Sequence, residues 1–150
     1  ADPRFDQQPL LEDPLDLLVP LGHRLAGQPS VALIDTADEA WIADRPGRPY
    51  HRLLLTTCAA AGFTPAVAHN ATEWDTGAAL VAAGLGIGLV PRLTRLPGSY
   101  PVARVPLSGD PAPSRHFVTA VRSGSRHHPV IADALTALEE LAHGGVPAAQ

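Results

Sequence analysis

Residues 80–91, LVAAGLGIGLVP, constrain the fold of this chain more than any other stretch of the sequence. Apolar residues at helical spacing lead up to Gly84, and a short apolar run typical of a buried strand covers residues 87–90. The segment therefore predicts a helix that ends at Gly84, followed by a strand. Gly84 suits a left-handed helix cap, while Gly86 and Gly88 suit a strand that passes close to another backbone.

The order of these elements argues against a phosphate-binding glycine loop. Such loops follow a strand and precede a helix, because phosphate oxygens bind the free N–H groups at a helix N-terminus. Here the glycines follow the end of a helix, which presents carbonyl oxygens and the negative end of the helix dipole. Nucleotide binding at this segment is therefore not expected.

The rest of the chain alternates short strands with helices, which indicates α/β architecture. Residues 15–20, LDLLVP, have the pattern of a strand that is buried on both faces. Helices are expected over residues 50–61, ending at Gly62, and from a capping box with Thr72 as the cap up to residue 83. The other expected elements are a helical turn at residues 33–36, strands at 41–43, before Asn70, in YPVARVPL and in HFVTAV, and a last helix from Pro129.

Composition limits the size and the partners of the protein. A chain of 150 residues with 45% hydrophobic side chains can form one domain or two small lobes. Its net charge is -4 and its basic residues are scattered, so a nucleic-acid-binding surface is not expected. The sequence contains neither an export signal nor an apolar run long enough for a membrane span, which favours a cytoplasmic protein without a membrane partner.

Residues with catalytic or metal-binding potential are sparse. Cys58 lies on the apolar stripe of its expected helix, where a small thiol is usually structural. His127 and His128 are adjacent and point apart, the other histidines are isolated, and no G-x-S-x-G motif or paired-acid site occurs. We therefore expect no catalytic residue, no metal site and no cofactor.

Polar groups follow two of the expected strands, at positions where α/β proteins bind ligands. The loops DRPGR and NATEW each end a strand and lead into a helix. Arg48 can grip a carboxylate with two hydrogen bonds, while Asn70, Thr72 and free backbone N–H groups can supply neutral ones. Each candidate also has a structural alternative: Arg48 as a solvated loop residue, Thr72 as a helix cap, and Trp74 as a core anchor instead of a lid.

Five phrases of the sequence resemble the effector-binding domain of LysR-type transcriptional regulators. They are LEDPLDLLVPLGHRLA, DTADEAWIAD, AAGFTPAVAHNAT, LVAAGLGIGLVPRL and VARVPL, of which the last ends at residue 107. The resemblance as a whole is taken to cover about residues 10–141. Each phrase alone is a weak signal, whereas five in order with suitable gaps are specific. The chain is thus similar to this family over nearly its whole length.

The resemblance implies a periplasmic-binding-protein type II fold, with two α/β lobes joined by crossing strands and an inducer bound between them. Residues 1–14 would form an N-terminal segment, 15–91 the second lobe with both crossing strands, 92–143 the return into the first lobe, and 144–150 a tail. The crossing strands would be residues 15–20 and 87–91. Their hinge would lie at Pro20, Gly86, Gly88 and Pro91.

The sequence departs from the family pattern at its N-terminal side. A complete effector domain has a first half-lobe before the first crossing strand, and a winged helix-turn-helix domain precedes it. Neither pattern is present in these 150 residues. The resemblance therefore implies one complete lobe and part of the other.

The implied function is effector sensing within a homo-oligomeric regulator that contacts DNA only through the absent domain. The effector would be a small organic anion, bound by Arg48, Asn70, Thr72 and Trp74. No enzymatic activity is expected. The alternative is a solute-binding protein or an enzyme fragment on the same fold, although the sequence contains neither an export signal nor a convergent acid–base pair.

Overall fold

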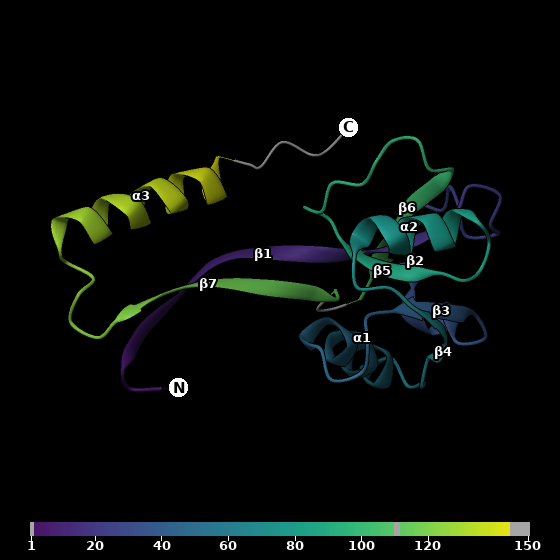
Figure 1. The fold of residues 1–150 in the computed structure, drawn as a ribbon, viewed down its shortest axis with the longest axis horizontal. Coiled ribbons are helices and arrows are strands. Elements are labelled where there is room, and N and C mark those ends of the chain that lie inside the picture. The colour runs from purple at the N-terminus through teal and green to yellow at the C-terminus, as the bar shows by residue number, and fades with distance from the viewer. Residues whose placement is uncertain (1, 110–111, 145–150) are drawn as a thin grey trace. The chain divides into compact units, whose positions relative to one another are not determined.

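Strand β1 (Phe5–Pro20) contributes to both of the units into which the chain divides. The computed structural model describes residues 2–109 and 112–144, and its mixture of helices and strands is the α/β architecture that the sequence predicts (Figure 1). One unit comprises residues 14–113. The other combines residues 1–13 with residues 114–150, so β1 passes from one unit to the other.

Four strands form the main sheet of the unit of residues 14–113, in the order β2 (Val31–Ala32), β6 (Val102–Ser108), β1 and β5 (Gly88–Pro91). The other elements of this unit are the turn η1 (Leu33–Thr36), strand β3 (Ala40–Ala43), helix α1 (Pro49–Ala60), strand β4 (Ala66–Asn70) and helix α2 (Trp74–Ala82). β1 pairs antiparallel with both β5 and β6, and Leu18 lies opposite Gly88. Residues 15–18 and 88–91, which lie in the two predicted crossing strands, are therefore neighbours in one sheet.

Both faces of β1 are buried in this unit, as its apolar sequence predicts. Leu17 packs in a core that includes Cys58 of α1, whereas Leu18 packs on the opposite face with Val81 of α2. Successive side chains of a strand point to opposite faces, so one segment supports two helices. In Figure 1 these helices lie on either side of β3 and β5.

Strands β3 and β4 form a second, parallel sheet, and β3 is also bridged to the chain at Ile87. The N–H of Ile87 donates to the carbonyl of Ala40, and the N–H of Ile42 donates to the carbonyl of Ile87, each at 2.8 Å. Gly86 has φ +153°, and a Cβ added there would lie 2.7 Å from the oxygen of Ala40. The expected close approach is confirmed at Gly86, whereas a Cβ at Gly88 would meet the Ile42 oxygen at an ordinary 3.5 Å.

Helix α2 ends in the glycine cap that the sequence predicts. Gly84 has φ +74°, a backbone conformation that costs glycine little. Its N–H donates to the carbonyl of Val81, and the N–H of Leu85 donates to the carbonyl of Leu80, which together form a Schellman motif. The helix therefore stops at the position where the glycine-rich segment begins.

The start of α2 differs from the prediction, because Thr72 does not cap the helix. Glu73 occupies the N-cap position, and no side chain accepts a hydrogen bond from the helix start. The N–H of Ala71 donates to the carbonyl of Ala43 at 2.8 Å, so pairing with β3 extends beyond the end of β4. This pairing keeps the backbone extended and delays the helix to Trp74.

The chain leaves the unit of residues 14–113 later than the sequence suggested. Residues 92–143 were expected to return to the first lobe, but residues 92–113 belong to the same unit as residues 14–91. The physical reason is that β6 pairs with the C-terminal part of β1 and that Leu96 and Tyr100 pack against the core around Val81. The chain therefore stays in this unit after β5 and leaves it only after residue 113.

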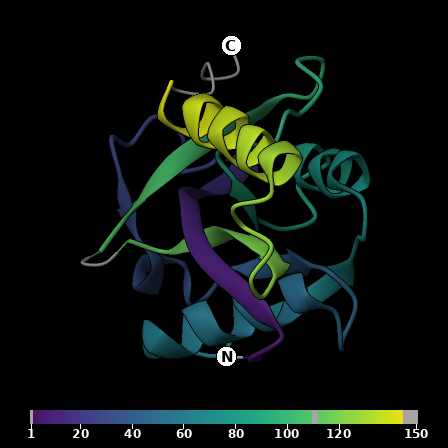
Figure 2. The same cartoon turned by 90° about the vertical axis from the view of Figure 1, so that its left-hand side faces the viewer.

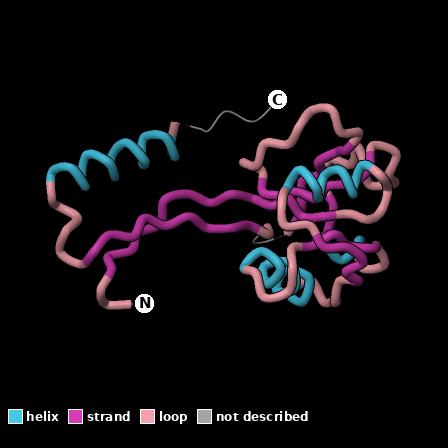
Figure 3. The backbone as a smooth tube through the Cα atoms, viewed as in Figure 1, coloured by secondary structure: helices cyan, strands magenta, loops and turns pink. Residues whose placement is uncertain are grey.

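The unit formed by the two chain ends contains the N-terminal half of β1, strand β7 (Ser114–Arg122) and helix α3 (Pro129–His143). β7 pairs with β1, and the two strands run side by side in Figure 3. Asp13 has no exposed surface and accepts a hydrogen bond from Nε of Arg115 at 2.8 Å. A buried ion pair therefore joins the two strands at the start of β7.

Helix α3, yellow in Figure 2, buries only part of its apolar surface. Leu135 is buried, whereas Val130 and Leu141 are 71% and 69% exposed. The predicted end of the helix at Gly144 agrees with its last residue, His143, while the expected tail of residues 144–150 lies almost wholly outside the described residues. No helix among the described residues has the length and hydrophobicity needed to cross a bilayer.

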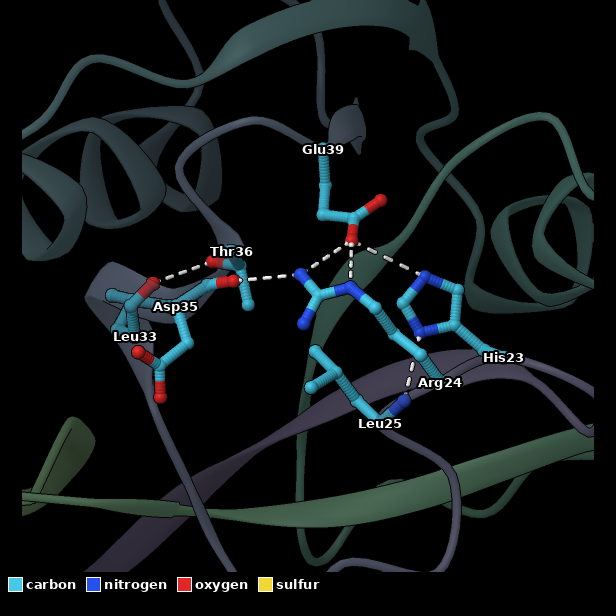
Figure 4. Close-up of polar contacts among 7 residues, drawn as sticks. All are labelled: His23, Arg24, Leu25, Leu33, Asp35, Thr36 and Glu39. Carbon is cyan, nitrogen blue, oxygen red and sulfur yellow. Dashed lines mark hydrogen bonds and ion pairs between the residues drawn. The ribbon is translucent and has the colours of Figure 1, made fainter.

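A cluster of polar contacts holds the loop between β1 and β2 (Figure 4). The guanidinium of Arg24 donates to the Glu39 carboxylate and to the carbonyl of Asp35, each at 2.8 Å. Nε2 of His23 lies 3.4 Å from the same Glu39 carboxylate. The other ring nitrogen of His23, Nδ1, accepts a hydrogen bond from the N–H of Leu25. These contacts fasten the segment HRLA to the loop that precedes β3.

Candidate functional site

Three of the four predicted binding residues line one hollow in the unit of residues 14–113. The hollow has a volume of about 360 Å³ and lies where the parallel strands β3 and β4 end and lead into α1 and α2. Its lining consists of Arg45, Arg48, Asn70, Ala71, Thr72, Glu73 and Thr76. Both its position at the carboxyl ends of strands and its volume are typical of small-molecule sites.

Asp44 holds the polar groups of this hollow in place. One oxygen of its carboxylate accepts a hydrogen bond from Nε of Arg48 at 3.0 Å, and the other accepts one from the backbone N–H of Arg45 at 2.7 Å. Its carbonyl oxygen accepts a hydrogen bond from the Asn70 side chain at 3.0 Å. Asp44 is 9% exposed, so these contacts are shielded from water. Asp44 is not among the binding residues predicted from the sequence, although it directly follows the buried strand β3.

The two arginines of the hollow differ in their freedom to bind an anion. Arg48 uses Nε for Asp44, and its side chain is 56% exposed, which leaves its terminal amino groups available. The Arg45 side chain makes no hydrogen bond or ion pair with residues 2–109 or 112–144. Because Arg48 neutralises Asp44, Arg45 supplies positive charge to the hollow, opposed by Glu73. The pair can donate several parallel hydrogen bonds to a carboxylate.

Thr72 carries a buried hydroxyl that has no hydrogen-bond partner among the described residues. Leaving such a group unsatisfied costs about 1–3 kcal/mol, a cost that any hydrogen-bonding molecule in the hollow, water included, would remove. The capping role considered for Thr72 is wrong, since Glu73 is the N-cap of α2. Its role in ligand binding stays a prediction.

Trp74 does not line the arginine hollow but an adjoining apolar cavity of about 60 Å³. Its ring meets the ring of Tyr50 edge to face, with centroids 4.7 Å apart. Trp74 is 36% exposed, so it is partly accessible and does not serve as a fully buried core anchor. The arginine hollow and the apolar cavity share three lining residues, Ala71, Thr72 and Glu73.

A family model described as the LysR substrate binding domain matches residues 1–142. The chain belongs to this family. The resemblance seen in the sequence is confirmed, and so are the periplasmic-binding-protein type II-like fold and, at the level of the family, a substrate-binding domain of LysR-type regulators.

Known relatives of this LysR domain are longer than the chain. The uncharacterized HTH-type transcriptional regulator YwbI of Bacillus subtilis (strain 168) is 34% identical over 87 residues, which make up 58% of this chain and 29% of that protein. The solved C-terminal domain of a probable LysR family regulator from Rhodococcus sp. RHA1 has a TM-score of 0.73 and 27% identity, covering 92% of this chain and 69% of that one. The effector-binding domain of QuiR, solved in complex with shikimate, shares the fold with a TM-score of 0.70 and 22% identity, over 93% of this chain and 65% of that one. The chain thus spans about a third of curated relatives such as YwbI.

The predicted hinge residues of this LysR domain all lie in the unit of residues 14–113. Pro91 ends β5 opposite Leu15, beside the point where β1 passes between the units, whereas Pro20 ends β1 at the far end of the paired segment. Gly86 and Gly88 lie against β3. A hinge role for these four residues stays a prediction.

The other reactive groups among the described residues of this LysR domain form no metal site. Cys58 has no exposed surface, and burial raises the pKa of its thiol to about 12, so it is not a nucleophile at neutral pH. Its interpretation as a core residue is confirmed. In the part of the chain that the structure describes, no three His, Cys, Asp or Glu side chains are grouped so that they could hold a metal ion.

Proposed function

We propose that this domain senses a small organic carboxylate, which binds in the arginine hollow at the ends of β3 and β4. The observation that carries the proposal is the arrangement around Asp44, whose buried carboxylate and carbonyl hold Arg48 and Asn70 at the rim of the hollow. A site held in place before the ligand arrives loses less entropy on binding.

The chemistry of the hollow favours a ligand with a single negative charge. The carboxylate of such a ligand accepts hydrogen bonds from Arg45 and from the terminal amino groups of Arg48. The first N–H groups of α2 have no intrahelical acceptor and add the positive end of the helix dipole. Glu73 lines the same hollow and repels a second anionic group on the ligand.

The role of the whole protein follows from the family. We propose that effector binding changes how a homo-oligomeric regulator engages DNA through a helix-turn-helix domain, in the cytoplasm and without enzymatic activity. Support comes from curated relatives that are named transcriptional regulators, among them YwbI and GltC of Bacillus subtilis.

Calorimetric or NMR titration of the chain with a panel of small monocarboxylates tests the proposal. Charge-assisted hydrogen bonds contribute about 1.5–3 kcal/mol, so Arg48→Ala is expected to weaken binding about 10- to 100-fold. Arg52→Ala is the matched control, because Arg52 is an exposed arginine of α1 outside the hollow. Equal affinities of the wild type, Arg45→Ala and Arg48→Ala would exclude this site.

A further inference from the structure

We infer that the apolar cavity beside Trp74 is a second subsite, which takes the short hydrocarbon chain of the same ligand. This inference rests on the proposed function, because the cavity adjoins the arginine hollow through Ala71, Thr72 and Glu73. The ligand class then narrows to straight-chain monocarboxylates, with the carboxylate at the arginines and the alkyl chain between α2 and the core.

The lining of the cavity suits hydrocarbon. Most of its surface comes from apolar side chains, including Leu18, Ile42, Leu54, Val81 and Val90. Two of its polar lining residues, Thr72 and Glu73, are shared with the arginine hollow. Its volume of about 60 Å³ leaves room for roughly four water-sized groups, or a chain of a few carbons.

Thr72 marks the junction at which the two parts of the ligand meet. Its buried hydroxyl has no partner among the described residues, and the residue lines both the arginine hollow and the apolar cavity. A carboxylate oxygen at this junction can accept the Thr72 hydrogen bond. The carbon next to the carboxylate then enters the cavity directly.

The walls of the cavity limit the width of the chain that enters. Tyr50 and Trp74 meet edge to face, while the α2 side of the cavity is lined by the small residues Gly77 and Ala78. Ala78 is 1% exposed, so a larger side chain at this position must project into space near the cavity. A cavity that holds benzene has a volume of about 150 Å³, so a phenyl group is too large for this one.

Affinity for this cavity is expected to rise with the chain length of the acid. Each buried methylene strengthens binding about fourfold, so butyrate is expected to bind about fifteen times more tightly than acetate. Benzoate gains no such advantage. A site made of the arginine hollow alone has nearly equal affinity for all of these acids.

The experiment compares acetate, propionate, butyrate and benzoate on the wild-type chain, Ala78→Val and Arg48→Ala, by NMR titration. In Ala78→Val the affinity is expected to lose its dependence on the chain length of the acid, while the affinity for acetate stays unchanged. Ala59→Val is the matched control, because Ala59 is an exposed alanine of a helix outside the cavity. Equal affinities for all four acids in the wild type, with binding still lost in Arg48→Ala, would overturn the subsite and leave the arginine site intact. Binding that is absent or independent of Arg48 would overturn both proposals.

A second measurement decides the matter if Ala78→Val fails to fold. In the wild type with bound butyrate, nuclear Overhauser contacts are expected between the terminal methyl of the ligand and the methyl groups of Val81 and Val90, which line the cavity. Contacts of that methyl with Thr76 alone, which lines the arginine hollow but not the cavity, would contradict the inference.

Discussion

Gly86→Ala is expected to destabilise the unit of residues 14–113 far more than Gly88→Ala, although the two glycines are neighbours in one motif. The backbone of Gly86 has φ +153°, which side-chain-bearing residues rarely adopt, and its added Cβ would lie 2.7 Å from the carbonyl oxygen of Ala40. That oxygen already accepts the hydrogen bond from the N–H of Ile87, so it cannot move away without weakening the bridge between β3 and residue 87.

The magnitude follows from these two terms. A non-glycine residue in a sparsely populated backbone region costs about 1–3 kcal/mol, and overpacking against backbone adds about 1–3 kcal/mol. The alanine also lowers the entropy of the unfolded chain, which returns about 0.4–1 kcal/mol. The net loss for Gly86→Ala is therefore about 1–5.5 kcal/mol, with a middle value of about 3 kcal/mol, against less than about 1 kcal/mol for Gly88→Ala, whose Cβ meets its nearest atom at 3.5 Å.

Urea unfolding followed by tryptophan fluorescence measures both variants. Trp41 is fully buried and is bridged to Ile87, so its emission reports on this region, and a Trp74→Phe background removes the other tryptophan. If the unfolding free energies of Gly86→Ala and Gly88→Ala differ by less than about 1 kcal/mol, the close approach of Gly86 to β3 is not what selects glycine there.

Three further predictions concern stability. Gly77→Ala is expected to stabilise the chain by about 0.5–1 kcal/mol, since the added Cβ meets only the Ala71 Cβ at 3.8 Å within a helix; a lower midpoint in urea would contradict this. Arg92→Ala is expected to lower the free energy of unfolding by about 1–3 kcal/mol, because it removes the hydrogen bonds to the buried Asp16 carboxylate. The double variant Asp16→Leu/Arg92→Leu should lose less, because it leaves no unpaired buried charge. The pKa of the Cys58 thiol is raised to about 12 in the folded chain, whereas the unfolded thiol ionises near pH 8.5. Above about pH 8.5 unfolding therefore releases a proton, and the free energy of unfolding falls as the pH rises. At pH 10 this loss of unfolding free energy amounts to about 2 kcal/mol. Cys58→Ala should not show the loss when its unfolding free energies at pH 8 and pH 10 are compared.

Local signals in the sequence were sufficient to predict most elements of the fold. Glycine after an apolar helical stripe marks a helix end because of its backbone freedom, and both Gly62 and Gly84 have the positive φ that such a cap requires. The apolar run of residues 15–20 predicted a strand buried on both faces for the same local reason. Such features depend on neighbouring residues alone.

Features that depend on distant partners were not predictable in the same way. The capping box at Thr72 failed because the N–H of Ala71 pairs with Ala43, a contact that no local pattern encodes. The role of Asp44 also depends on a residue far along the chain, since its carbonyl binds the side chain of Asn70. The exit from the larger unit was misplaced because β6 returns to pair with β1.

Gly86 supports the proposed arginine hollow, although it does not line that hollow. Gly86 lets the backbone around Ile87 lie against β3, and β3 leads directly into Asp44, which positions Arg48 and Asn70. A side chain at residue 86 would displace β3 and, with it, the donors of the arginine hollow. The motif therefore resembles a phosphate-binding loop only in its spacing of glycines: its backbone freedom is used to pack one strand against another, and the proposed anion site lies at the far end of that strand.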